Sequence, residues 1–176
     1  MTTPLAAGGN TSEPIELRPR HYDDPDAQLL VKALYAEQLE TYSFADSPDL
    51  ETAEDYVAPS GLLLVGYTPS GQPVGCGGCR TYDRAGGIAE VRKMFVAPEY
   101  RGHGLGRKIL SALEQHAAAN GAQQMLLETG ALNYAAIRLY LASGYEAIAP
   151  YVPGRRETNR AFRKNFWCNP SSLTAR

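Results

Sequence analysis

Three glycines at alternating positions, Gly102, Gly104 and Gly106, constrain this chain more than any other feature. They follow the apolar run 91–96 and lead directly into an amphipathic segment that begins at Leu105. Glycines let the backbone turn tightly with its N–H groups uncovered, and the first turn of a helix adds unpaired N–H groups and the positive end of the helix dipole. Phosphate groups bind at such helix N-termini. The stretch therefore predicts a strand, an anion-binding turn and a helix.

Two common nucleotide-binding patterns do not fit this stretch. A P-loop ends in Gly-Lys-Ser/Thr, but here Lys108 is followed by Ile109. The dinucleotide pattern G-x-G-x-x-G needs a third glycine where Arg107 stands, and Pro98 separates the strand from the glycines. What remains is Arg-x-x-Gly-x-Gly, which begins at Arg101.

A second motif follows downstream. The pattern N-x-x-A-x-x-L-Y-x-x-x-G-F/Y is matched by Asn133, Ala136, Leu139, Tyr140, Gly144 and Tyr145. Together the two motifs resemble the GNAT superfamily of acyl-CoA N-acyltransferases, whose glycine signature binds the pyrophosphate of coenzyme A. Matching elements span residues 89–148, and the flanks agree in the order of their elements.

Composition favours a single domain and does not indicate a highly charged macromolecule as its partner. The chain has 176 residues, 44% of them hydrophobic, and a formal net charge of -2, so no global field attracts nucleic acid or an anionic membrane. No apolar run approaches the roughly 20 residues of a spanning helix, and residues 1–13 lack a basic leader. We therefore predict a cytoplasmic protein with disordered tails at 1–13 and 168–176. The resemblance implies that residues 14–167 form an N-acetyltransferase domain.

Cys76 and Cys79 form a nominal C-x-x-C pattern. The residues after it read as strand, whereas a redox pair needs a helix N-terminus to lower the pKa of a thiol. On a strand these two side chains face opposite ways, and no second pair of cysteines or histidines completes a zinc site. We interpret both cysteines as structural and expect no metal.

Hydrophobic periodicity predicts seven strands, at residues 15–19, 62–67, 73–82, 88–96, 124–129, 145–148 and 160–167. Helical spacing marks residues 24–41, 49–57, 105–119 and 133–142, with Asn133 as an N-cap and Gly121 and Gly144 as left-handed stops. Sequential hairpins with one helix crossover indicate an α/β single-domain fold: a mixed, mostly antiparallel sheet of about seven strands flanked by helices. This order is similar to that of the GNAT fold.

The resemblance also implies where acetyl-CoA binds. The signature turn would hold the pyrophosphate with Arg101, Gly102, His103, Gly104, Leu105, Gly106 and Arg107. The main chain of Met94, Phe95 and Val96 would bind the pantetheine arm and the thioester oxygen, because the family splays its fourth and fifth strands there. Asn133 would contact the arm as well as cap its helix, whereas His103 taken alone reads as an exposed spacer.

The resemblance further implies a base and an acid. Glu90 stands where several family members carry a catalytic glutamate, and alternation places it on one face with Arg92, Met94 and Val96 if no bulge intervenes. A surface ion pair between Glu90 and Arg92 is the alternative, and Glu128 or a water chain could serve instead. Tyr140 stands where many members place the tyrosine that protonates the thiolate, although it also fits a packing face.

These features predict an N-acetyltransferase that moves the acetyl group of acetyl-CoA to a primary amine of a small molecule. The acceptor would be bounded by Tyr42, Phe44, Asp46 and Glu128 and by the loop that contains Tyr151, Arg155 and Arg156. The alternatives are a non-catalytic acyl-CoA-binding regulatory or interaction module, a peptide or protein N-acetyltransferase, and a transferase of another acyl chain. A homodimer formed through the last strands is left open.

Overall fold

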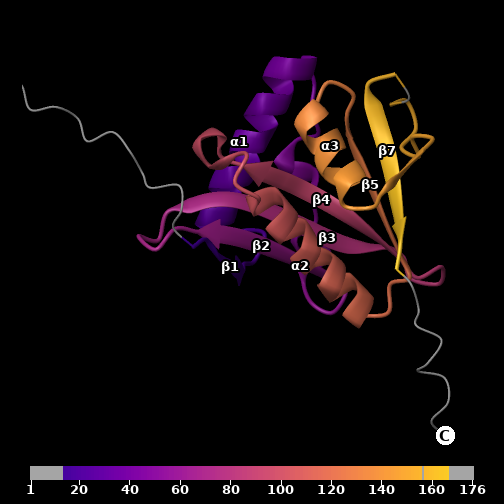
Figure 1. The fold of residues 1–176 in the computed structure, drawn as a ribbon, viewed down its shortest axis with the longest axis horizontal. Coiled ribbons are helices and arrows are strands. Elements are labelled where there is room, and N and C mark those ends of the chain that lie inside the picture. The colour runs from indigo at the N-terminus through magenta and orange to yellow at the C-terminus, as the bar shows by residue number, and fades with distance from the viewer. Residues whose placement is uncertain (1–13, 156, 167–176) are drawn as a thin grey trace, which may run out of the picture.

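The computed structural model describes residues 14–155 and 157–166, so the predicted tails at 1–13 and 168–176 lie outside the described residues. The described chain forms a seven-stranded sheet in the order β1-β2-β3-β4-β5-β7-β6, which confirms the predicted fold class (Figure 1). Neighbouring strands are antiparallel except for β4 and β5, which are parallel. The strands are β1 (Glu16–Pro19), β2 (Gly61–Tyr67), β3 (Pro73–Asp83), β4 (Ile88–Val96), β5 (Gln124–Gly130), β6 (Glu146–Ile148) and β7 (Asn159–Asn165).

Helices cover both faces of the sheet. On one face lie α2 (Leu105–Ala119) and α3 (Tyr134–Ala142), and on the other lies α1 (Pro25–Tyr42) (Figure 1). Because strand side chains alternate, the sheet supplies apolar residues to two separate core clusters. Ile109 and Leu113 of α2 pack in one, and Leu30 of α1 packs in the other. Among the described helices, none combines the length and apolarity that crossing a membrane requires.

The predicted helix ends are confirmed. The Asn133 side chain accepts a hydrogen bond from the Ala136 N–H at 3.2 Å and so caps α3. Gly121 and Gly144 follow α2 and α3 with φ of +91° and +86°, the left-handed conformation that glycine adopts without strain. At α1 the Asp24 side chain provides the N-cap.

The predicted helix over 49–57 is wrong. Two 3-10 turns, Pro48–Leu50 and Ala53–Tyr56, stand there, and Glu51 between them is extended. Tyr56 stacks on Tyr22 with ring centroids 5.1 Å apart, and Glu51 reaches across to β4. These contacts join segments distant in the chain, so local periodicity does not reveal them.

A bulge interrupts β4 at Lys93, whose φ is +55°. Pairing with β3 shifts register between Cys76 and Gly78, opposite this point. A bulge inserts an extra residue and turns the following side chains to the other face. Arg92 and Lys93 therefore both reach Glu51 on the α1 face of the sheet.

The predicted common face of β4 is consequently wrong. Glu90 lies on the α1 face, where it contacts Arg92, but Met94 and Val96 pack against the cluster under α2. The alternation holds on each side of Lys93 and is broken at the bulge itself. The condition attached to the prediction, an unbulged strand, is not met.

The two strand cysteines are structural, as predicted. Cys76 belongs to the cluster under α1 and Cys79 to the cluster under α2, so the side chains face opposite ways. Burial raises the pKa of each thiol to about 12, which keeps both protonated at neutral pH. Neither thiol has the exposure or the charge of a reactive cysteine.

Candidate functional site

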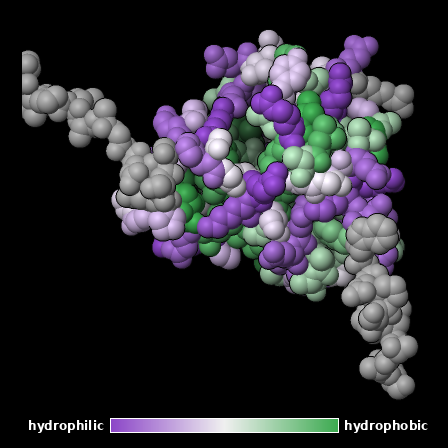
Figure 2. All heavy atoms as spheres, viewed as in Figure 1, coloured by the Kyte–Doolittle hydropathy of each residue, from purple (hydrophilic) through white to green (hydrophobic). Residues whose placement is uncertain are grey.

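A cavity of about 620 Å³ opens where β4 and β5 diverge. The two strands pair only over residues 88–90 and 124–126, and beyond these residues each strand pairs only with its outer neighbour. Figure 2 shows a hollow between α1 and α3 with hydrophobic residues at its bottom and hydrophilic residues around it. The predicted splay of the fourth and fifth strands is thus present, and residues 90–96 of β4 line the cavity.

The glycine turn forms one end of this cavity. Gly102 and Gly104 have φ of +80° and +84°, and Gly104 is the N-cap of α2. A Cβ at either position would meet nothing within 4 Å, so glycine is needed there for its backbone conformation. At Gly106 a Cβ would come within 3.3 Å of Leu139. The N–H groups of residues 102–107 have no acceptor among the residues that the structure describes, which suits an anion.

Arg101, predicted to hold the pyrophosphate, lines this end of the cavity, and its side chain is bonded to protein groups. Its guanidinium donates to the Val96 carbonyl at 2.8 Å and to the Glu37 carboxylate at 2.6 Å, so it braces the turn against β4 and α1. His103 is exposed and does not line the cavity. The other arginines that line this end are Arg107 and Arg138, and neither forms an ion pair within the described part of the chain.

Arg138 was missed by the motif comparison. Ala135, Arg138, Leu139 and Ala142 all line the cavity, and their spacing places them on one face of α3. The signal in the sequence was therefore this spacing within the second motif. Arg138, which forms no ion pair with any described residue, adds positive charge to the wall of the cavity.

Tyr140 reaches the cavity from within the core. Its side chain is 4% exposed and packs between Tyr145 and Phe162, with ring centroids at 5.8 and 6.0 Å. Tyr140 also lines the cavity, so its side chain packs in the core and still borders the space where the donor would bind. Burial raises the pKa of Tyr140, which keeps its hydroxyl protonated at neutral pH. Asn133 lines the same wall from the start of α3.

Glu90 is buried, with 2% of its surface exposed, so the alternative of a surface ion pair is wrong. Its carboxylate accepts hydrogen bonds from Arg80 Nε at 2.9 Å and from the Tyr151 hydroxyl at 2.8 Å. Arg92 stands farther off, at 3.9 Å. Glu90 lines the cavity while both of its oxygens are held in place.

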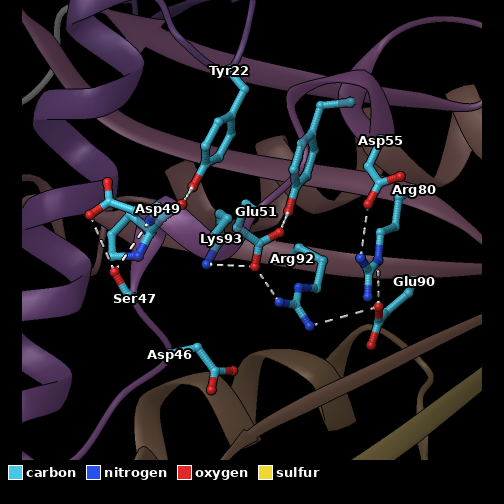
Figure 3. A network of polar contacts seen from close by, with 12 residues as sticks. Tyr22, Asp46, Ser47, Asp49, Glu51, Asp55, Arg80, Glu90, Arg92 and Lys93 are labelled. Carbon is cyan, nitrogen blue, oxygen red and sulfur yellow. Dashed lines mark hydrogen bonds and ion pairs between the residues drawn. The ribbon is translucent and has the colours of Figure 1, made fainter.

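Glu51 joins the same network and was not recognised in the sequence (Figure 3). It binds Arg92, Lys93 at 3.0 Å and the Tyr56 hydroxyl at 2.6 Å. Burial acts to raise the pKa of Glu51, but the hydrogen bond from Tyr56 and the charges of Arg92 and Lys93 outweigh it and lower the pKa to about 2. Its partner on β4 is 41 residues away, which explains why no local pattern revealed it.

Glu128 fastens the loop between β6 and β7. Its carboxylate accepts hydrogen bonds from the backbone N–H groups of Tyr151 and Val152 at 2.7 and 2.9 Å and from Asn159 Nδ2 at 2.9 Å. Glu128 and Val152 line the cavity, but Tyr151, predicted as a substrate contact, does not. The Tyr151 hydroxyl instead donates its hydrogen bond to Glu90.

The last residue of α1, Tyr42, and the loop after it form the other rim. The Tyr42 hydroxyl accepts a hydrogen bond from the Leu132 N–H at 3.1 Å, and its ring leaves no room for a side chain at Gly130. Phe44 lines the cavity and is 45% exposed. The predicted contact Arg156 lies outside the described residues. Over 14–155 and 157–166, no cluster of three histidine, cysteine or acidic side chains is arranged to bind a metal ion.

Comparison with known proteins identifies the family. Residues 29–145 match the model of the Acetyltransferase (GNAT) family. The chain belongs to this family. The predictions of an acyltransferase and of acetyl-CoA as its cosubstrate are confirmed at the level of the family.

Individual relatives agree with this assignment. An IAA acetyltransferase of Azospirillum brasilense is 42% identical over 109 residues, which cover 62% of this chain and 70% of that protein. A mycothiol acetyltransferase of Thermobispora bispora is 32% identical over 162 residues, covering 82% of this chain and 50% of that protein. Among solved structures, an acyl-CoA N-acyltransferase of Klebsiella pneumoniae, so described from its family, matches with a TM-score of 0.70 and 28% identity. The match covers 90% of this chain and 100% of that chain. The PaiA N-acetyltransferase of Thermoplasma acidophilum, solved with coenzyme A, shares the fold with a TM-score of 0.64 at 16% identity over 87% of this chain and 99% of that chain.

Proposed function

We propose that this GNAT protein transfers the acetyl group of acetyl-CoA to a primary amine of a small molecule by direct attack in a ternary complex. The observation that carries this proposal is one continuous cavity. It extends from the uncovered N–H groups of the glycine turn, along residues 90–96 of β4, to the loops that hold Asp46 and Arg155. Donor and acceptor can therefore meet within one space, which favours transfer by proximity.

The main chain would hold the donor. The N–H groups of residues 102–107 suit the pyrophosphate, and Arg107 and Arg138 add positive charge to that end. The diverging part of β4 offers backbone groups that β5 does not pair, over Met94 to Val96. Asn133 lines the wall opposite and suits the polar pantetheine arm.

The acceptor attacks as the neutral amine, and its nitrogen must then lose one proton. Its nitrogen forms the new C–N bond, the C–S bond breaks, and the proton leaves the nitrogen while the thiolate departs. A free ammonium ion has a pKa of about 10, far above that of a carboxyl group, so a carboxylate does not readily remove its proton. Glu90 and Glu128 are the carboxylates that line the cavity near the divergence of β4 and β5, and both accept hydrogen bonds from the protein. The ammonium formed after attack is a stronger acid, and we assign its proton to Glu90 through a water, with Glu128 keeping the loop in place.

Tyr140 would stabilise the departing thiolate. A thiol has an ordinary pKa of about 8.5, below that of a buried tyrosine, so full proton transfer from Tyr140 is unfavourable. Donation of a hydrogen bond to the sulfur needs no transfer and stabilises the charge as it develops. We therefore propose that Tyr140 acts as a hydrogen-bond donor in the transition state.

Release of coenzyme A thiol from acetyl-CoA, measured with and without a panel of amines, tests the function. The enzyme gives thiol release that depends on the amine, together with an acetylated product in the mass spectrum. A regulatory module of the same fold binds acetyl-CoA by calorimetry but releases no thiol with any amine. Turnover of peptide N-termini alone would instead favour a peptide N-acetyltransferase.

A further inference from the structure

An ion pair between two loops bounds the acceptor end of the cavity. Arg155, in the loop between β6 and β7, donates a hydrogen bond to Asp46, in the loop after α1, across 109 residues of sequence. Both residues line the cavity, and their side chains remain 28% and 38% exposed. The pair is therefore open to a molecule that enters the cavity.

The other carboxylates at this end are held more firmly. Glu51 and Glu128 each accept from three donors, and Glu90 is buried between Arg80 and Tyr151. The Asp46 carboxylate has one polar contact, with Arg155, within the described chain. In Figure 3 Asp46 lies apart from the network that binds the strand residues. Of these carboxylates, Asp46 is therefore the one whose displacement breaks the fewest hydrogen bonds and ion pairs.

Asp46 also has other cations close enough to stabilise its charge. The hydrogen bond from Arg155 lowers the pKa of Asp46 against the effect of burial, and the charges of Arg92 and Lys93 lower it further. A displaced Asp46 thus remains in a positive field. Arg155, by contrast, forms no second ion pair among the described residues, so on losing Asp46 it needs another anion.

We propose, as an extension of the function above, that Arg155 binds a carboxylate of the acceptor and that Asp46 occupies this position until the acceptor arrives. The acceptors are then amines that carry a carboxylate, of the amino-acid class. A guanidinium matches a carboxylate with two parallel hydrogen bonds. Exchange of one carboxylate for another leaves neither charge unpaired, whereas a simple amine brings a further cation close to Arg92, Lys93 and Arg155.

Matched pairs of acceptors test this inference: amino acids against their carboxamides, with thiol release as the measurement. In the wild type, kcat/KM is about tenfold or more higher for the acid than for the amide. Arg155→Gln removes this preference by raising KM for the acids only, and Arg155→Lys restores part of it. Asp46→Asn, which removes the competing carboxylate, lowers KM for the acids and leaves KM for the amides unchanged.

Two controls separate this role from a structural one. Arg84→Gln alters an exposed arginine that bonds Ser60 and does not line the cavity, and it leaves kcat/KM for both kinds of acceptor unchanged. Acetyl-CoA affinity by calorimetry reports whether each variant is folded. Equal kcat/KM for acids and amides in the wild type, or equal losses for both in Arg155→Gln, overturns the inference while the transferase function stands. If no amine supports thiol release, the proposed function fails instead.

Discussion

The two ends of the cavity are built from different parts of the chain. At the donor end, residues 102 and 104–107 line the space, and the backbone N–H groups of this glycine turn have no acceptor within the described chain. At the acceptor end, charged side chains from four segments face one another as ion pairs, with Arg155 and Asp46 at the rim. Donor recognition therefore depends on local backbone geometry, and acceptor recognition on partners brought together by the fold.

The largest effect is expected from Gly104→Asp. The substitution places a carboxylate at the anion site and an L side chain at φ of +84°, so acetyl-CoA affinity should fall by more than about 100-fold. Isothermal titration calorimetry measures the loss. The acceptor network is remote from this turn, and circular dichroism should remain that of the folded protein.

Gly71→Asp is a matched control for that substitution. Gly71 stands in the β2–β3 turn at φ of +85°, and its Cβ would also meet nothing within 4 Å. The two variants thus carry the same backbone strain, which costs about 1 kcal/mol, and the same added charge. If Gly71→Asp weakened acetyl-CoA as much as Gly104→Asp, the loss would come from folding and the anion site would be refuted.

Tyr140→Phe should act on turnover alone. The ring keeps its packing against Tyr145 and Phe162, but the hydrogen bond to the thiolate is lost, so kcat should fall by about 100-fold. Acetyl-CoA affinity should stay within about twofold, because the hydroxyl acts in the transition state. Single-turnover kinetics beside calorimetry separate the two quantities. Unchanged kcat would remove Tyr140 from the mechanism.

The contrast between the ends also explains what the sequence reveals. The glycine turn, the helix caps and the second motif are local, and together with hydrophobic periodicity they predicted the order of the elements along the chain and suggested where the donor binds. Glu51 and Arg138 escaped prediction for different reasons: Glu51 bonds a strand residue 41 positions away, and the spacing that places Arg138 on the cavity face was overlooked within the motif. Because of the bulge at Lys93, Met94 and Val96 do not share a face of the sheet with Glu90. A pattern of strict alternation does not predict an inserted residue.

Glu51→Gln tests whether the ion pairs at the acceptor end stabilise the folded protein. Arg92 and Lys93 lose their shared anion, so the free energy of unfolding at pH 7 should fall by about 2 kcal/mol. The folded-state pKa of about 2 lies below the ordinary 4.5, so the carboxylate stabilises the fold above about pH 4.5 and loses this effect as the pH falls toward 2. The difference between wild type and variant should therefore be constant near neutrality and shrink in that acidic window.

Urea unfolding of both proteins between pH 7 and the acid limit of solubility measures this difference. Glu54→Gln is the control, because Glu54 lies in the adjacent 3-10 turn and forms no ion pair within the described chain. It should follow the wild type at every pH. A Glu51→Gln variant whose deficit is unchanged at low pH would show that the loss arises from packing, and the charge network would need revision.

The smallest effect is expected from Arg138→Gln, which sharpens the comparison from the donor side. If backbone groups supply most of the anion binding, removal of one cavity-wall cation should weaken acetyl-CoA by only about fivefold, in line with a partly exposed charge. The loss should diminish as salt rises, because screening already weakens the wild-type interaction. Arg160→Gln, on β7 and outside the cavity lining, should leave affinity and its salt dependence unchanged. A loss for Arg138→Gln as large as that for Gly104→Asp would mean that side-chain charge, rather than the exposed main chain, dominates donor binding.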